Sequence, residues 1–213
     1  MDENAVWSVE QKVKRTIENL EKNNMEACFV KDAGEVIEKL RKIIKEGDTV
    51  SVGGSMSIFE VGVIDFLKKG NYKFLDRYEE GLTAEDKKEI FRKSFFADDY
   101  IVSTNAITEN GELYNVDGTG NRVAAMIYGP DKVIVIAGIN KIVRDLNQAV
   151  NRVKFTAAPA NSKRLKLDNP CTKVGYCVNC NSPSRICNDY VVIRKQPKKG
   201  RIKVIIVEQE LGY

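Results

Sequence analysis

Four of the five cysteines fall within 17 residues near the C-terminus, at Cys171, Cys177, Cys180 and Cys187, with the spacing C-x5-C-x2-C-x6-C. Thiolates that converge on a small volume bind metal ions or iron–sulfur clusters, and the close pair Cys177 and Cys180 lets two sulfurs of one turn face the same centre. We expect a [4Fe–4S] cluster on these four cysteines, because clusters tolerate irregular spacing and commonly have a proline near a ligand, here Pro170.

Other interpretations of the cysteines stay open. A structural zinc ion is the main alternative, although zinc sites typically show two close cysteine pairs and this chain has one. Disulfides need an oxidising compartment, and reduced cysteines without a ligand are the last alternative. Cys28 lies in an apolar run and is expected to be a small buried hydrophobic residue.

Two glycine turns could hold an anion. Residues 53–57, Gly-Gly-Ser-Met-Ser, join an expected strand to an expected helix, and residues 118–122, Gly-Thr-Gly-Asn-Arg, open another helix. Backbone amides gather at a helix start, and Arg122 adds a guanidinium for a phosphate or carboxylate. An ordinary turn with a helix cap is the alternative. The predicted ligand-binding residues are Gly53, Gly54, Ser55, Met56, Ser57, Asn105, Gly118, Thr119, Gly120, Asn121 and Arg122.

Composition excludes several kinds of chemistry. The chain has no histidine, so any acid–base work must use carboxylates, lysines, hydroxyls or cysteines. The net charge is only +4 and the charges are mixed, which argues against nucleic acid as a partner. Without an apolar run long enough to span a bilayer, or a secretory pattern at the N-terminus, we expect a cytoplasmic protein that does not bind membranes.

The elements that must position these residues alternate between helix and strand. Helical spacing begins at residue 3, a capping box at Asp32 and Glu35 opens a second helix, and residues 132–137 form an apolar strand typical of parallel sheets. We predict one helix from Ser57 through Leu67, a helix that ends before Pro159, and an antiparallel pair of final strands at residues 190–193 and 202–207.

This pattern predicts an α/β fold with a mostly parallel sheet, helices on both faces, a C-terminal cysteine-rich loop and edge strands. We expect an α/β domain over residues 1–162 and a metal-binding tail over residues 163–213 that packs on the same domain. The basic run at residues 195–203 is expected to be a solvated hairpin tip.

As an ordered set, several motifs resemble the LUD domain of lactate-utilization proteins. They are residues 53–57, Ala-Ile-Thr-Glu-Asn-Gly-Glu-Leu at 106–113, residues 118–122, and the strand at 132–137 followed by Gly138. The resemblance implies the sheet shared by glucosamine-phosphate deaminases, ribose-phosphate isomerases and coenzyme A transferases, with ligands at the strand ends. It also implies a component of lactate or 2-hydroxy acid utilization that works beside a redox partner subunit.

The segment Thr108-Glu109-Asn110-Gly111 is similar to the Ser-Glu-Asn-Gly motif of coenzyme A transferases. Carried over, that likeness makes Glu109 the candidate catalytic nucleophile of a transferase, or a carboxylate of a sugar-phosphate isomerase. A non-catalytic protein with a structural zinc is the third hypothesis. An exposed edge strand would permit a homodimer without requiring one.

Overall fold

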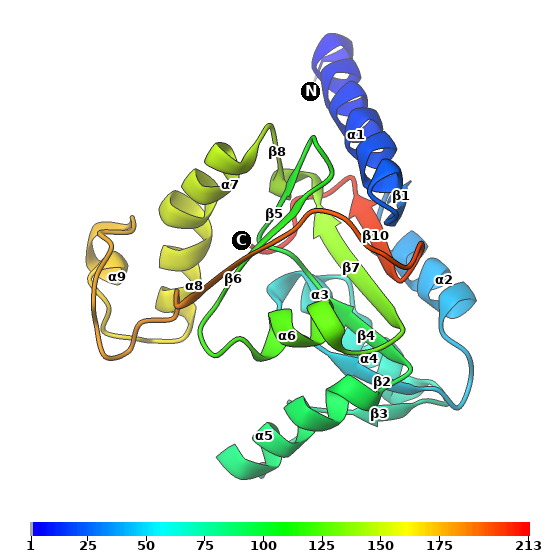
Figure 1. Ribbon diagram of the computed structural model, residues 1–213, viewed down its shortest axis with the longest axis vertical. Helices are drawn as coiled ribbons and strands as arrows, with labels where there is room; N and C mark the ends of the chain where they lie inside the picture. The colour runs from blue at the N-terminus through cyan, green and yellow to red at the C-terminus, as the bar shows by residue number, and fades with distance from the viewer. Residues whose placement is uncertain (1) are drawn as a thin grey trace.

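The computed structural model describes residues 2–213, which form two sheets covered by helices (Figure 1). Sheet A has six strands, all parallel, in the order β1-β10-β7-β4-β2-β3. Its strands are β1 (Glu26–Val30), β10 (Ile202–Val207), β7 (Lys132–Gly138), β4 (Asp99–Val102), β2 (Thr49–Val52) and β3 (Lys73–Leu75). The predicted fold class, a mostly parallel sheet with helices on both faces, is confirmed.

The strands in the middle of sheet A are apolar on both faces because helices cover both sides. In β7, Ile134 and Ile136 pack on one face, while Val133 and Val135 pack on the other, and all four are fully buried. One face carries α2 (Ala33–Ile43), α3 (Met56–Glu60) and α4 (Val63–Lys69), and the other carries α1 (Glu3–Lys22) and α6 (Asn121–Tyr128). This double burial is what parallel strands require.

The predicted pairing of the last two strands is wrong. Strand β10 lies between β1 and β7 inside sheet A, whereas β9 (Asp189–Ile193) is the edge strand of sheet B. The two strands separate because Ile202, Val204, Ile205 and Ile206 are buried from both sides and need two strand neighbours. The boundary at residue 162 therefore does not follow the sheet, since the last strand belongs to the main layer.

Sheet B has the order β8-β5-β6-β9 and packs beside the carboxyl edge of sheet A. Its strands are β8 (Ile142–Val143), β5 (Ala106–Thr108), β6 (Leu113–Asp117) and β9. β5 and β6 form an antiparallel hairpin, and β9 pairs antiparallel with β6 along five residue pairs. Through this pairing the segment that follows the cysteines is fixed to the hairpin that carries Asp117.

Two helix predictions need correction. The helix expected from Ser57 to Leu67 is broken into α3 and α4 by Gly62, whose φ of +74° is unfavourable for residues with a side chain. The helix expected to end before Pro159 continues past it: α7 (Leu146–Arg152) leads into a π-helical segment (Val153–Ala157) and then α8 (Ala158–Arg164). The wider π turn accommodates the missing N–H of the proline.

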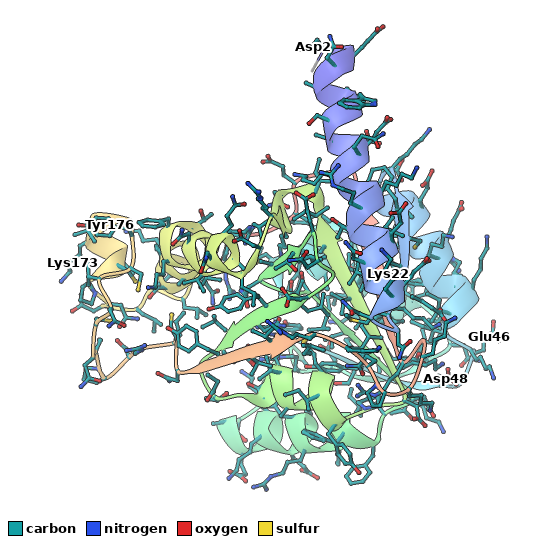
Figure 2. The ribbon with its side chains drawn as sticks, turned by 45° about the horizontal axis from the view of Figure 1, so that its top comes forward. Asp2, Lys22, Glu46, Asp48, Lys173 and Tyr176 are labelled. Atoms are coloured by element: carbon teal, nitrogen blue, oxygen red, sulfur yellow. The ribbon has the colours of Figure 1, made fainter. Side chains whose placement is uncertain are left out.

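The remaining helices are α5 (Ala84–Lys93), the 3-10 turns η1 (Ser94–Phe96) and η2 (Ile139–Lys141), and α9 (Cys171–Val174). In Figure 1, α1 projects from the body on one side, while α7, α8 and α9 lie on the other. The segment that carries the four cysteines, residues 170–188, is called the cysteine tail. Figure 2 shows Lys173 and Tyr176 at the outer end of this tail, and Asp2 at the free end of α1. Among residues 2–213 there is no helix with the length and apolar character needed to cross a bilayer.

Candidate functional site

A cavity of about 350 Å³ lies where β2, β4 and β7 of sheet A end. It is lined by Gly54 after β2, by Ser103 after β4, and by Lys141 in η2 after β7. The other walls come from the turn at residues 117–119, the helix α8 and the cysteine tail at Ile186 and Cys187. Ligands of open α/β sheets bind at this edge, because the loops after parallel strands converge there.

Most of the predicted ligand-binding residues reach this cavity. The ones that line it are Gly54, Ser55, Met56, Asn105, Gly118, Thr119, Asn121 and Arg122. Gly53, Ser57 and Gly120 are not part of its lining. Gly120, with φ of +71°, instead begins α6 and packs against the carboxylate of Asp189.

Gly53 allows the turn after β2 to pack closely against the side chains of Val102 and Tyr100 in β4. A Cβ atom at this position would lie 2.6 Å from Val102 Cγ2 and 3.0 Å from the hydroxyl of Tyr100. We expect Gly53→Ala to lower the free energy of unfolding by about 1–3 kcal/mol, as overpacking does in a close-packed interior. Urea unfolding tests this, with Gly54→Ala as the matched control, because a Cβ there meets only the Arg77 side chain at 3.5 Å. Equal losses in both variants would contradict the close-packing role.

Arg122 lines the cavity, yet its guanidinium is committed to the protein. It donates to Asp117 Oδ1 (2.8 Å), Ser103 O (2.9 Å), Asn115 Oδ1 (2.6 Å), Asn105 Oδ1 (2.9 Å) and Val116 O (3.2 Å). These five hydrogen bonds equal the number of its N–H groups. Arg122 therefore fixes the sheet B hairpin against the end of β4.

The cysteine tail packs directly on the second glycine turn. The backbone N–H of Asn188 donates to Asp117 O (2.9 Å), and its side-chain amide donates to Gly118 O (2.8 Å). A Cβ at Gly118 would touch Ile186 at 3.5 Å. The turn at residues 117–120 is therefore held by the tail, and tail and cavity share a wall.

Lys141 is the main residue that the sequence interpretation missed. Its side chain is buried, with 2% of the residue exposed, and Nζ donates to Ser57 Oγ (2.8 Å) and Ser103 Oγ (3.0 Å). Burial, together with the charges of Arg152 and Arg122, lowers the pKa of Lys141 to about 7. The only signal in the sequence was its position just after an apolar strand.

The cavity carries excess positive charge. Besides Lys141 and Arg122, it is lined by Arg77 and Arg164, while Asp117 is its one acidic lining residue among residues 2–213. Asp117 is paired with Arg122 at 2.6 Å. Arg77 lies over the ring of Phe91 at 4.3 Å and Arg164 donates to Asn161 Oδ1, and within the described chain neither has a carboxylate within 4.0 Å.

Glu109 is not brought to this cavity. It sits in the turn between β5 and β6 and forms an ion pair with Arg15 of α1 at 2.7 Å, and its backbone carbonyl accepts a hydrogen bond from Asn19 (2.7 Å). These contacts attach α1 to the hairpin. The structure thus separates the Glu-Asn-Gly segment from the glycine turns and from Lys141.

The four tail cysteines surround a second, smaller cavity of about 20 Å³. Arg185 donates to the carbonyls of Cys180 (2.6 Å) and Cys187 (2.9 Å), and the backbone N–H of Asn179 donates to Cys177 Sγ (3.3 Å). Burial, together with the neighbouring cysteines and against the opposing charge of Arg185, raises the pKa of Cys187 to about 11. Among residues 2–213, no three His, Cys, Asp or Glu side chains are gathered in a group that could hold a metal ion.

The chain thus has an α/β fold with a parallel main sheet and a cavity at the carboxyl edge of that sheet. The chain belongs to the LUD domain family, because the model of that domain matches residues 13–207. The family resemblance of the ordered motifs is thereby confirmed.

Several solved structures are similar to this chain at low sequence identity. The crystal structure of a DUF162 family protein from Deinococcus radiodurans is similar over 93% of this chain and 98% of that one, with 14% identity and a TM-score of 0.54. The match to the crystal structure of eIF2B delta from Chaetomium thermophilum covers 56% of this chain and 50% of that one, with 22% identity and a TM-score of 0.36. The match to the crystal structure of 5-methylthioribose 1-phosphate isomerase from Pyrococcus horikoshii covers 75% of this chain and 49% of that one, with 14% identity and a TM-score of 0.35. No match was found among curated proteins.

Proposed function

We propose that this LUD domain protein binds a small 2-hydroxy or 2-oxo acid in the cavity and holds a [4Fe–4S] cluster on the tail cysteines, as a component of lactate or related 2-hydroxy acid utilization. The observation that carries the proposal is a shared wall. Ala158, Ile186 and Cys187 line both the basic cavity and the cysteine cavity. A ligand and a cluster at these two places would be separated by little more than one layer of side chains.

Charge and hydrogen bonding support an anionic ligand. Arg77 and Arg164 face the cavity without a carboxylate partner in residues 2–213, and Lys141 brings a buried amine. The hydroxyl of Tyr213, which also lines the cavity, is buried and has no hydrogen-bond partner within the described residues. Buried polar groups are normally paired, so these donors favour a ligand with a carboxylate and a further oxygen atom.

We place the proposed cluster at the cysteine cavity, because all four tail cysteines line it. A structural zinc ion, which needs four thiolates about 2.3 Å from one metal, is the alternative that metal analysis of the purified protein distinguishes. The N–H···S hydrogen bond to Cys177 and the ties from Arg185 are the kind of contacts that surround cluster ligands. A [4Fe–4S] cluster bound by Cys171, Cys177, Cys180 and Cys187 would supply one-electron transfer.

The residues of this chain would bind and orient the acid, while a redox partner subunit completes the reaction. Conversion of a 2-hydroxy acid to a 2-oxo acid releases two electrons and two protons. Among residues 2–213 the glycine turns lack the G-x-G-x-x-G pattern of a dinucleotide site, so the proposal places the two-electron acceptor, a flavin or nicotinamide, on the partner.

The test is anaerobic purification followed by iron, acid-labile sulfide and zinc analysis. We expect about four iron and four sulfide per chain, as the cluster formula requires. Cys177→Ser and Cys180→Ser should each lose most of the iron, because each removes a ligand. Cys28→Ser is the matched control, since Cys28 packs in β1 against the main core, away from the tail. Stoichiometric zinc, or iron retained in both tail variants, would contradict the cluster.

A further inference from the structure

Lys141 occupies a position that is unusual for a lysine. Its amine lies at the floor of the basic cavity, where it donates to the hydroxyls of Ser57 and Ser103. The amine has no carboxylate within 4.0 Å in the described part of the chain, although buried ammonium groups are normally paired with one. A group so placed either stays neutral or waits for an anionic partner.

Cations dominate the surroundings of the Lys141 amine. Arg152 of α7 and Arg122 of α6 both disfavour its protonation, and Glu60 of α3 acts weakly in the opposite direction. Arg152 is itself fixed by hydrogen bonds to Asn140 O (2.9 Å) and Asn105 O (2.6 Å). Near pH 7 the free protein therefore holds this amine in a mixture of its neutral and protonated forms.

Of the two serine hydroxyls that contact this amine, the one of Ser103 connects it to the cavity. Ser57 Oγ also donates to Leu211 O (3.1 Å), which fixes its orientation. The hydroxyl of Ser103 lines the cavity, and its best remaining acceptors are at 3.4 Å and 3.5 Å. Ser103 thus has a hydroxyl proton that is only weakly held, beside an amine able to accept it.

Because the chain has no histidine, the site lacks the side chain that usually exchanges protons near neutral pH. Carboxylates do not fill that role either, since Asp117 is the one acidic residue on the cavity wall in residues 2–213 and its charge is paired with Arg122. Lysine is known to act as a general base when burial lowers its pKa.

We propose that Lys141 is the acid–base group of this site and exchanges a proton with the oxygen atom on C2 of a bound 2-hydroxy or 2-oxo acid. The inference rests on the proposed function, and it assigns the carboxylate of the acid to Arg77 and Arg164. With a 2-oxo acid, the protonated amine donates a hydrogen bond to the carbonyl oxygen. With a 2-hydroxy acid, the neutral amine accepts the hydroxyl proton.

The proton balance follows directly. When the hydroxyl proton moves to Nζ, the oxygen keeps the electron pair of the broken O–H bond and the carbonyl can form. The hydrogen on C2 then leaves with its electron pair to the flavin or nicotinamide acceptor of the partner subunit. In the reverse direction the ammonium of Lys141 returns the proton to the C2 oxygen.

The test compares pyruvate with propionate, two carboxylates of similar size that differ in the oxygen on C2. Titration calorimetry from pH 6 to pH 9, in buffers of different ionisation enthalpy, measures affinity and proton uptake for each. We expect pyruvate to take up close to one proton at pH 8 and its Kd to rise up to about tenfold per pH unit above pH 7, as one linked proton requires. Propionate should show neither effect.

The variants test the assignment separately. Lys141→Met should bind pyruvate with the weak, pH-independent affinity of propionate, whereas Lys163→Met, which changes an exposed lysine of α8, should bind both acids like the wild type. Equal pH dependence for the two acids in the wild-type protein would overturn the role of Lys141 and leave the anion site intact. Failure of both acids to bind would overturn the anion site, and the inference with it.

Discussion

Replacement of Arg122 by methionine is expected to lower the free energy of unfolding by about 3–5 kcal/mol, the usual result of removing one partner of a buried ion pair. The side chain of Asp117 is 6% exposed and that of Arg122 is 11% exposed. Without the guanidinium, the Asp117 charge and the amide oxygens of Asn105 and Asn115 lose their donor at a position that is mostly buried. The measurement is urea unfolding followed by circular dichroism.

A second substitution separates the charge from the packing. In Arg122→Met with Asp117→Asn, the unpaired charge is gone, while the asparagine oxygen can still accept the hydrogen bond from Val123 N (3.0 Å) that begins α6. We expect the double variant to be more stable than Arg122→Met alone. Lys88→Met, which removes an exposed ion pair on α5, should change stability by less than about 1 kcal/mol. A similarly small decrease in the free energy of unfolding for Arg122→Met would show that the hydrogen-bond network around Arg122 contributes little to stability.

Local chemistry in the sequence was enough to predict the layers of the fold. Asp32 caps the start of α2 as predicted, because its carboxylate accepts from Glu35 N (3.0 Å). The return bond of the predicted capping box is displaced by one residue, since the Glu35 carboxylate accepts from Lys31 N (2.9 Å), the residue before the N-cap. The apolar run at residues 132–137 is β7, buried from both sides. Both signals concern residues that are neighbours in sequence, so they can be recognised without knowledge of the tertiary structure.

Pairing over long distances was harder to predict. The sequence of β10 alternates only weakly, and its neighbours β1 and β7 lie far away in the chain, so nothing local indicated that it enters sheet A. β9 was expected to pair with β10, yet its register with β6 is set by the hairpin that also holds the cysteine tail. The order of strands in a sheet depends on which buried surfaces pack together, and local patterns in a single sequence do not contain that information.

In the candidate site, too, local features could be predicted from the sequence and long-range contacts could not. The glycine turns were placed at the sheet edge because strand and helix signals flank them, and most of their residues do line the cavity. The sequence did not indicate the acceptors that β6 and its neighbours bring to Arg122, because they lie on other elements, and its role toward an anion stays a prediction. Lys141 was missed because a lysine in a sequence is normally exposed, and only the tertiary structure shows that it is buried.

Replacement of Lys141 by methionine is expected to change how the stability of the protein depends on pH. Burial lowers the pKa of Lys141 from 10.5 to about 7 in the folded state. Between those values the unfolded chain binds one more proton than the folded chain, so the free energy of unfolding rises with pH by up to about 1.4 kcal/mol per unit. Below pH 7 both states carry the proton, and the folded state bears the full cost of a buried charge.

Methionine has a similar length and never titrates, so Lys141→Met should lack this rise. We expect the variant to be the more stable protein at pH 7 and its advantage to shrink by about 1.4 kcal/mol per pH unit from pH 7.5 to pH 9.5, as loss of one titrating proton requires. Urea unfolding at several pH values measures this difference, and Lys163→Met should follow the wild type throughout. Parallel curves for the wild type and Lys141→Met would mean that Lys141 stays charged in the folded protein, which would also remove it as the base for a C2 hydroxyl.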